Sequence, residues 1–176
     1  MEKFVERQEI YNGKVVHVVL DDVELDDGKL AKREVVKHSG GACIALQDDD
    51  GRFFMVSQFR YALGAEMLEF CAGKLEKGED PQAAVLRECQ EELGYTCKDL
   101  KAFGYIVPTC GYCDEKIYLF YAKKDQYVGT NFDDDENLSL KKYSLDEIQK
   151  MILEGRLHDA KTIALVMHLQ MHGIKS

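Results

Sequence analysis

The chain has 176 residues, 45% of them hydrophobic, which is enough for one sizeable core and short for two independent domains. Its 32 acidic residues outnumber 23 basic ones, giving a formal charge of −9 with no Lys/Arg tract, so neither nucleic acid nor an anionic membrane is expected as a partner. No apolar run approaches the ~20 residues of a membrane-spanning helix, and the N-terminus is charged, unlike a signal peptide. We therefore expect a cytoplasmic protein whose six cysteines are mostly reduced.

Residues 1–37 are predicted to form a β ribbon. Asn12-Gly13 and Asp26-Asp27-Gly28 are hairpin-turn signals, and the segment between them is rich in β-branched residues. Such a ribbon has more edge than one small domain can cover. Two possibilities stay open here: the ribbon packs on a second subunit, or it forms an ordinary edge hairpin of a monomer. We divide the chain into this ribbon, expected to mediate homodimerisation, and a main domain over 38–176.

Two antiparallel strands are predicted beyond Gly40, in the segments GGACIALQ and RFFMVSQFR. Arg60 ends the second strand and is placed to pair with a phosphate. A short strand over 67–70 leads into Cys71-Ala72-Gly73, whose small side chains let the backbone approach a ligand closely. The carbonyl group within this turn, at Ala72, is a candidate metal ligand.

The segment GKLEKGEDPQAAVLRECQEELGY, residues 73–95, is predicted to be a loop followed by one acid-rich helix over 81–93. Asp80 is a suitable N-cap and Pro81 suits the first helical turn. Gly94 supplies the left-handed residue that commonly ends a helix.

One face of this helix is apolar, and a different arc is acidic. The apolar positions are Val85, Leu86, Cys89 and Leu93. Glu88, Glu91 and Glu92 fall on the other arc at spacings of three and four residues, so their like charges repel. Clustered carboxylates are typical ligands of Mg²⁺ or Mn²⁺, whereas a solvated acidic face is the plainer alternative. Arg87 offsets part of the charge, and Glu79 lies near enough to form an ion pair with it.

The spacing of these residues closely resembles the signature of the Nudix hydrolases, enzymes that cleave nucleoside diphosphates linked to another group. The matching positions are Gly73, Glu79, Arg87, Glu88, Glu91, Glu92 and Gly94. Cys89 stands where the family usually has an aliphatic residue, and Tyr95 is a less common apolar choice. The resemblance implies an α/β fold, the Nudix-type α/β/α sandwich with a mixed sheet between helices, to which the N-terminal β-hairpin ribbon is added. It also implies Mg²⁺, with Mn²⁺ able to replace it, held by Glu88, Glu91, Glu92 and the carbonyl of Ala72.

Segments before the signature further resemble the ADP-ribose pyrophosphatase branch of this family. These segments are VVKHSGGACIAL, VSQFR and EMLEFCAGK. Two departures from the branch occur: Cys71 replaces the usual proline of the turn before the signature, and Cys110 stands where a proline usually precedes the glycine aligned with Gly111. The second departure lies in an irregular loop over 107–115 and bears on the choice between ADP-ribose and other nucleotide sugars. Cys110 and Cys113 match a C-x-x-C spacing but lack the second ligand pair of a zinc site.

Beyond the signature, strands are predicted over 100–105 and 116–124, and two helices near the C-terminus over 145–154 and 160–172. The acidic run 133–136 lies between the second of these strands and the first helix. Through the resemblance, it corresponds to a loop from which this branch brings a glutamate over the metals to activate water. Glu136 is the glutamate of that run, and Asp134 stays open as a competing candidate.

Together with the resemblance, these residues predict Mg²⁺-dependent hydrolysis of ADP-ribose to AMP and ribose 5-phosphate. The catalytic candidates are Glu136, Glu91 and Arg87. The candidates for substrate binding are Arg33, Arg60 and Glu115. Alternatives are a hydrolase of GDP-mannose or another nucleoside diphosphate derivative, a non-catalytic Nudix-type module that senses a nucleotide, and an interaction protein whose acidic helix is only a docking face.

Overall fold

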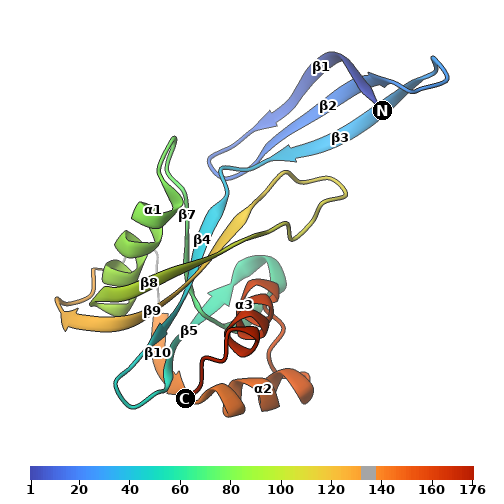
Figure 1. Cartoon of the computed structure of the whole chain (residues 1–176). Helices are drawn as coiled ribbons and strands as arrows, with labels where there is room; N and C mark the ends of the chain where they lie inside the picture. Colours follow the sequence, from blue (N-terminus) through green and yellow to red (C-terminus); the bar gives the residue numbers. More distant parts are fainter. Residues whose placement is uncertain (132–137) are drawn as a thin grey trace. The chain divides into compact units, whose positions relative to one another are not determined.

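The computed structural model describes residues 1–131 and 138–176. Two compact units are found: Met1–Gly40 together with Val107–Lys116, and Gly41–Ile106 together with Ile117–Ser176. The path of the chain through both is drawn in Figure 1. The division into domains after residue 37, and the role of the first domain in dimerisation, stay predictions.

The first unit contains a three-stranded antiparallel sheet in the order β1-β2-β3. Its strands are β1 (Lys3–Asn12), β2 (His17–Glu24) and β3 (Leu30–Lys37). Both predicted hairpins are confirmed, and the second turn contains Gly28, whose φ of +80° favours glycine. The loop Val107–Lys116 forms no regular strand, as predicted, and is attached to β3 because the Val36 N–H donates to the carbonyl oxygen of Tyr112 at 2.7 Å.

The second unit is organised around a mixed seven-stranded sheet. Its main path runs β10-β5-β4-β9-β8, while β6 pairs with β5 and β7 with β4. The strands are β4 (Gly41–Gln47), β5 (Phe53–Arg60), β6 (Ala65–Glu69), β7 (Cys71–Lys74), β8 (Tyr95–Ile106), β9 (Ile117–Tyr127) and β10 (Leu138–Tyr143). β4 and β9 are parallel, and the other pairs are antiparallel. β8 is longer than predicted, because its first residue, Tyr95, already pairs with Tyr127 at the end of β9.

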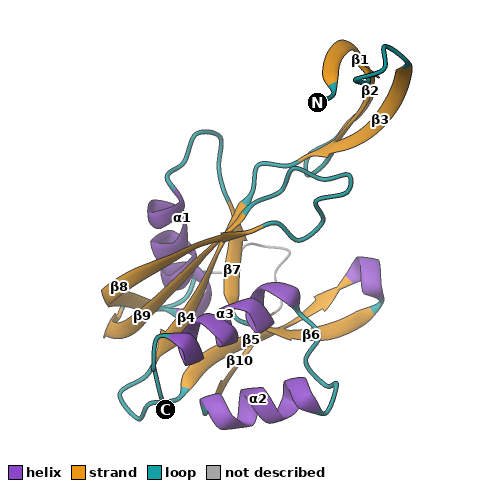
Figure 2. Ribbon diagram, turned by 45° about the vertical axis from the view of Figure 1, so that its right-hand side comes forward, coloured by secondary structure: helices purple, strands orange, loops and turns teal. Residues whose placement is uncertain are grey.

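Helices cover both faces of this sheet (Figure 2). They are α1 (Pro81–Glu88), α2 (Leu145–Leu153) and α3 (Ala160–Met171), with a short 3₁₀ turn η1 (Tyr61–Leu63) and a π-helical turn η2 (Cys89–Leu93). Alternate residues of the buried strand β4 point to opposite faces, so Cys43 and Ala45 pack with α2 and α3, and Ala42, Ile44 and Leu46 pack with α1. This arrangement confirms the predicted α/β/α fold. In the part of the chain that the structure describes, no helix is long and apolar enough to span a membrane.

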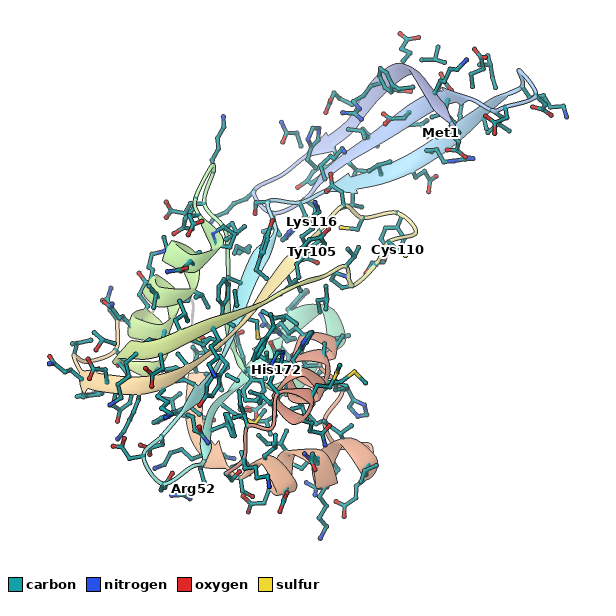
Figure 3. All side chains as sticks on the ribbon, viewed as in Figure 1. Met1, Arg52, Tyr105, Cys110, Lys116 and His172 are labelled. Atoms are coloured by element: carbon teal, nitrogen blue, oxygen red, sulfur yellow. The ribbon has the colours of Figure 1, made fainter. Side chains whose placement is uncertain are left out.

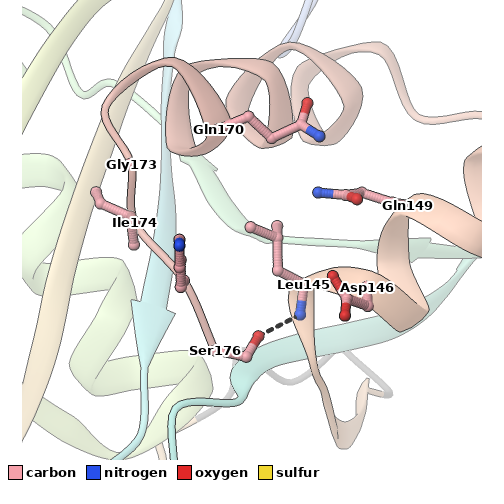
Figure 4. A pocket seen from close by; sticks show the side chains of 8 residues that line it. Leu145, Asp146, Gln149, Gln170, Gly173, Ile174 and Ser176 are labelled. Atoms are coloured by element: carbon pink, nitrogen blue, oxygen red, sulfur yellow. Dashed lines mark hydrogen bonds between the residues drawn. The ribbon is translucent and has the colours of Figure 1, made fainter.

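A pocket of about 360 Å³ lies beside α2 and the C-terminal segment (Figure 4). It is lined by Leu145, Asp146, Gln149, Gln170, Gly173, Ile174, Lys175 and Ser176. The N–H of Leu145 donates to Oγ of Ser176 across its wall. None of these residues belongs to the acidic signature.

Candidate active site

The acidic helix predicted over 81–93 is confirmed, with a difference in its last turn. α1 begins after Asp80, whose carboxylate accepts hydrogen bonds from two backbone N–H groups of the first turn. The chain then widens into the π-helical turn η2, and Gly94 ends it in the left-handed conformation with φ of +76°. Single π turns inside helices are frequent at functional sites. Here the turn carries Glu91 and Glu92, two of the three acidic residues predicted on one arc of the helix.

Gly73 allows the first acidic residue of the helix to lie against the sheet. It belongs to β7, which pairs with β4. A Cβ atom added at Gly73 would lie 1.8 Å from both Cδ and Oε1 of Glu88. Only glycine therefore leaves room for the carboxylate of Glu88 against this backbone, one residue after Ala72. Contact between positions so far apart in the sequence explains why the signature requires a glycine before its helix.

Arg87 connects the loop before the helix with two of the acidic residues. Its Nε lies 3.1 Å from Oε1 of Glu79, which confirms the predicted ion pair. Its Nη1 lies 2.8 Å from Oε1 of Glu88 and 2.9 Å from Oε2 of Glu91. The hydrogen bond from Arg87 lowers the pKa of Glu79, and the surrounding carboxylates raise the pKa of Arg87. Arg87 thus holds the like charges of Glu88 and Glu91 close together.

Glu92 is the most deeply buried of the three glutamates on the acidic arc of the helix, with 4% of its surface exposed. It lies close to Cys71 of β7, and burial together with the charge of Glu92 raises the pKa of the Cys71 thiol well above its ordinary value. A buried carboxylate is costly unless hydrogen bonds or a cation compensate its charge. Glu92 thus places a buried carboxylate beside β7, next to the turn that contains Ala72.

The residues of this site fit a divalent metal ion by two criteria. The donor set consists of hard oxygen atoms, which Mg²⁺ and Mn²⁺ prefer. The cradle at Gly73 brings the carboxylate of Glu88 to the backbone that carries the Ala72 carbonyl. Within residues 1–131 and 138–176, however, no three carboxylates are close enough together to bind one metal ion. Arg87 is ion-paired with both Glu88 and Glu91.

Arg60, predicted to pair with a phosphate, makes an ion pair that sequence reasoning missed. Its Nε and Nη2 donate to the two carboxylate oxygens of Glu69 at 2.8 and 2.6 Å. Glu69 is 2% exposed and also receives Lys161 of α3, whose Nζ lies 2.9 Å from Asp159. Burial raises the pKa of Glu69, but Arg60 and Lys161 outweigh it, so the pKa falls below its ordinary value. The contact of Arg60 with a phosphate stays a prediction.

A further buried hydrogen bond joins the start of α3 to Phe70, the residue between β6 and β7. The backbone N–H of Phe70 donates to Oγ1 of Thr162 at 2.8 Å, and this hydroxyl donates to Asp159 at 2.6 Å. Phe70 and Thr162 are 92 positions apart, so no local pattern could have revealed their contact. These two hydrogen bonds hold the backbone in place just before Cys71-Ala72-Gly73.

Arg33 and Glu115 belong to the first unit, and their predicted contacts with a substrate stay predictions. Arg33 is ion-paired with Glu2, and it lines a pocket of about 420 Å³ together with Tyr112. Glu115 lies 3.4 Å from Nδ1 of His38. Glu136 and its competitor Asp134 lie outside the described residues, so the structure does not place the predicted base.

Comparison with known proteins connects this geometry with a family. The NUDIX domain profile matches residues 37–166. An ADP-ribose pyrophosphatase of Bacillus subtilis (strain 168) is 37% identical over 172 residues, covering 97% of this chain and 93% of the relative. A methanol dehydrogenase activator of Bacillus methanolicus is 38% identical over 174 residues, with the same coverage of 97% and 93%.

Two further similarities concern substrate class and fold. A GDP-mannose pyrophosphatase of Cronobacter sakazakii is 28% identical over 172 residues, covering 91% of this chain and 90% of the relative. A solved structure described as an ADP compounds hydrolase superposes with a TM-score of 0.83 at 16% identity, covering 98% of this chain and 96% of that one, which shows the shared fold. The resemblance found in the sequence is confirmed, and the chain belongs to the Nudix family.

Proposed function

We propose that this Nudix hydrolase cleaves the pyrophosphate bond of ADP-ribose with Mg²⁺, releasing AMP and ribose 5-phosphate. The observation that carries the proposal is the close approach of Glu88 to Gly73, which puts the carboxylate of Glu88 against the backbone next to Ala72. The near full-length relatives named ADP-ribose pyrophosphatase support this choice of substrate.

The acidic helix would hold the metal. The proposed ligands are Glu88, Glu91, Glu92 and the carbonyl of Ala72. When bound, Mg²⁺ or Mn²⁺ supplies positive charge to phosphate oxygens and lowers the pKa of a coordinated water. Arg87 contributes to the same charge balance, and Glu79 keeps Arg87 in place through their ion pair. To bind the metal ion, Glu88 and Glu91 would have to give up hydrogen bonds that they accept from Arg87.

The remaining residues would handle the proton and the substrate. We assign the removal of a proton from the attacking water to Glu136, with Asp134 as the alternative. Arg60 is assigned to a phosphate, because its guanidinium is already oriented by the buried carboxylate of Glu69. Arg33 and Glu115 are assigned to the rest of the substrate.

GDP-mannose is the second candidate substrate. Relatives named GDP-mannose pyrophosphatase match 89–91% of this chain at 28–30% identity. Cys110 also replaces a proline usual in the ADP-ribose branch, in the loop Val107–Lys116. A module that only senses nucleotides is disfavoured, because every acidic residue of the signature is present.

The first unit supports a homodimer in this proposal. Phe4 and Leu30 are 62% and 70% exposed, and large apolar side chains on a thin sheet are stabilised when a second chain covers them. We further place the protein in the cytoplasm, a location supported by the six free cysteines. Sedimentation velocity of the full chain tests the assembly, and a monomer at micromolar concentration would contradict it.

The function is tested by identifying products. The protein is incubated with Mg²⁺ and, separately, ADP-ribose, ADP-glucose, GDP-mannose and a nucleoside triphosphate, and the products are separated by chromatography. Selective release of AMP from ADP-ribose is expected, whereas preferred cleavage of GDP-mannose would overturn the substrate assignment. The variant Glu92→Gln should lower kcat by at least ~10³-fold through loss of metal-held charge, and near-normal turnover would refute the metal assignment.

A further inference from the structure

Two free cysteines are in contact at the start of the turn that carries Glu91 and Glu92. Sγ of Cys89 lies 3.1 Å from Sγ of Cys97. Cys89 is fully buried and opens the π-helical turn η2, whereas Cys97 lies on β8 and is partly exposed. The contact joins the turn that carries the acidic residues to the strand that follows it.

We propose that Cys89 and Cys97 are an oxidisable thiol pair whose disulfide restrains the acidic turn and lowers the activity of the enzyme. The sulfur atoms of a disulfide are ~2.05 Å apart, so oxidation requires an approach of about 1 Å from the present distance. Such a shift is within reach of two side chains that already touch. The effect on activity rests on the proposed function, whereas formation of the bond does not.

The expected chemistry uses a peroxide as the oxidant. The thiolate of Cys97 attacks one oxygen of hydrogen peroxide, giving a sulfenic acid at Cys97 and releasing hydroxide, which takes up a proton to become water. The sulfur of Cys89 then attacks the sulfenic sulfur, the S–S bond forms, and a second water leaves. In total, two thiols lose two electrons and two protons, and one peroxide is reduced to two waters.

Cys97 is the suitable point of attack by the oxidant. Its side chain is partly exposed, and the hydrogen bond with Cys89 lowers its pKa. Cys43 and Cys71 are fully buried, so an oxidant in solution does not reach either thiol. Within the second unit, the structure therefore favours oxidation at the pair that is already in contact.

The position of the pair explains why its oxidation should affect catalysis. Cys89 directly follows Glu88 and precedes Glu91 by two positions, so its displacement is passed through the backbone to both proposed ligands. Misplacing catalytic groups by ~1 Å can cost as much as ~10²-fold in rate. The disulfide is also reversible, because a small dithiol reduces it and restores both thiols.

Tryptic digestion offers a direct measurement, because cleavage after Arg87 and Lys98 leaves both cysteines in one peptide, residues 88–98, without any other cysteine. The experiment uses the full chain with Cys110→Ser and Cys113→Ser, which removes the exposed thiol at Cys110 (Figure 3) and its neighbour. After treatment with hydrogen peroxide, removal of the peroxide and alkylation with iodoacetamide, the peptide should carry no alkyl group and be lighter by two hydrogen atoms. The untreated peptide should carry two alkyl groups.

Two readouts then connect the bond with the site. Oxidation should lower kcat on ADP-ribose by at least about tenfold, and dithiothreitol should restore it. It should also weaken binding of Mn²⁺ alone, followed by electron paramagnetic resonance, which needs no substrate. The variants Cys97→Ala and Cys89→Val each lack one of the two thiols and cannot form the bond. Their kcat and their Mn²⁺ binding should therefore not change on treatment with peroxide.

The outcomes separate the thiol pair from the proposed function. A peptide that stays doubly alkylated, or a sulfinic acid at Cys97 without a cross-link, would overturn the proposal. A disulfide that forms but changes neither Mn²⁺ binding nor turnover would overturn the coupling to the site. If the enzyme hydrolyses none of the substrates, the peptide mass and the Mn²⁺ titration still decide between these results.

Discussion

Replacing Gly73 with alanine tests how closely the helix and strand β7 must approach. The new Cβ would lie 1.8 Å from Cδ and Oε1 of Glu88. Since non-bonded heavy atoms settle ~3.5 Å or more apart, the carboxylate of Glu88 must move by roughly 1.7 Å. A misplacement of this size predicts that Gly73→Ala lowers kcat on ADP-ribose by at least ~10²-fold.

The same substitution should disturb stability far less than activity. Gly73 is not among the glycines with positive φ, so alanine is compatible with its backbone. Because alanine lowers the conformational entropy of the unfolded chain, it contributes ~0.4–1 kcal/mol of stability at such a position. The atoms that must give way belong to the end of a flexible side chain. We therefore expect the melting temperature of Gly73→Ala to stay within a few degrees of the wild type.

A double-mutant cycle separates displacement of Glu88 from other effects of the new methyl group. If Gly73→Ala acts by moving this carboxylate, adding it to Glu88→Ala should cause almost no further loss of kcat. The assay is steady-state turnover at saturating ADP-ribose and Mg²⁺, combined with thermal unfolding of each variant. Turnover of Gly73→Ala within threefold of the wild type, or full additivity with Glu88→Ala, would refute the reasoning.

Two further predictions concern the buried ion pairs around Glu69. Lys161→Met removes one partner of this buried carboxylate and should lower the free energy of unfolding by ~3–5 kcal/mol in urea titrations, whereas Lys150→Met, at an exposed ion pair, should cost less than ~1 kcal/mol. Equal losses would contradict the importance of burial. The pKa of folded Glu69 lies below its ordinary value of 4.5, so its contribution to stability is complete above that pH and is lost as the pH falls through the folded-state pKa. Glu69→Gln should therefore unfold with a weaker pH dependence below pH 4.5, and an unchanged profile would argue against it.

Local chemistry was readable from the sequence because each signal acts over a few residues. Asp80, Pro81 and Gly94 mark the ends of the acidic helix, and the structure confirms them as cap, first residue and left-handed terminus. The spacing of Arg87 from Glu79 predicted an ion pair that is present at 3.1 Å. Hairpin turns at Asn12 and Gly28 were equally local. In each case the physical cause is a backbone preference or a reach of one or two helical turns.

The family signature extended this reading to a fold. Its spacing predicted the Nudix-type sandwich, and the sheet with helices on both faces agrees. The resemblance also named ligands and a base, but Glu136 lies outside the described residues. Arg33 and Glu115 belong to the first unit, and their roles in substrate binding stay predictions.

Only the tertiary structure decided which distant residues meet. Glu69 and Lys161 are 92 positions apart, and their ion pair exists because α3 packs against the sheet beside β6. The approach of Glu88 to Gly73 and the meeting of Cys89 with Cys97 likewise depend on how the helix lies on the strands. Sequence spacing determines the faces of a helix or strand, because their periods are set by backbone geometry. Which faces touch, and how closely, follows from packing of the whole core, which no short stretch of sequence contains.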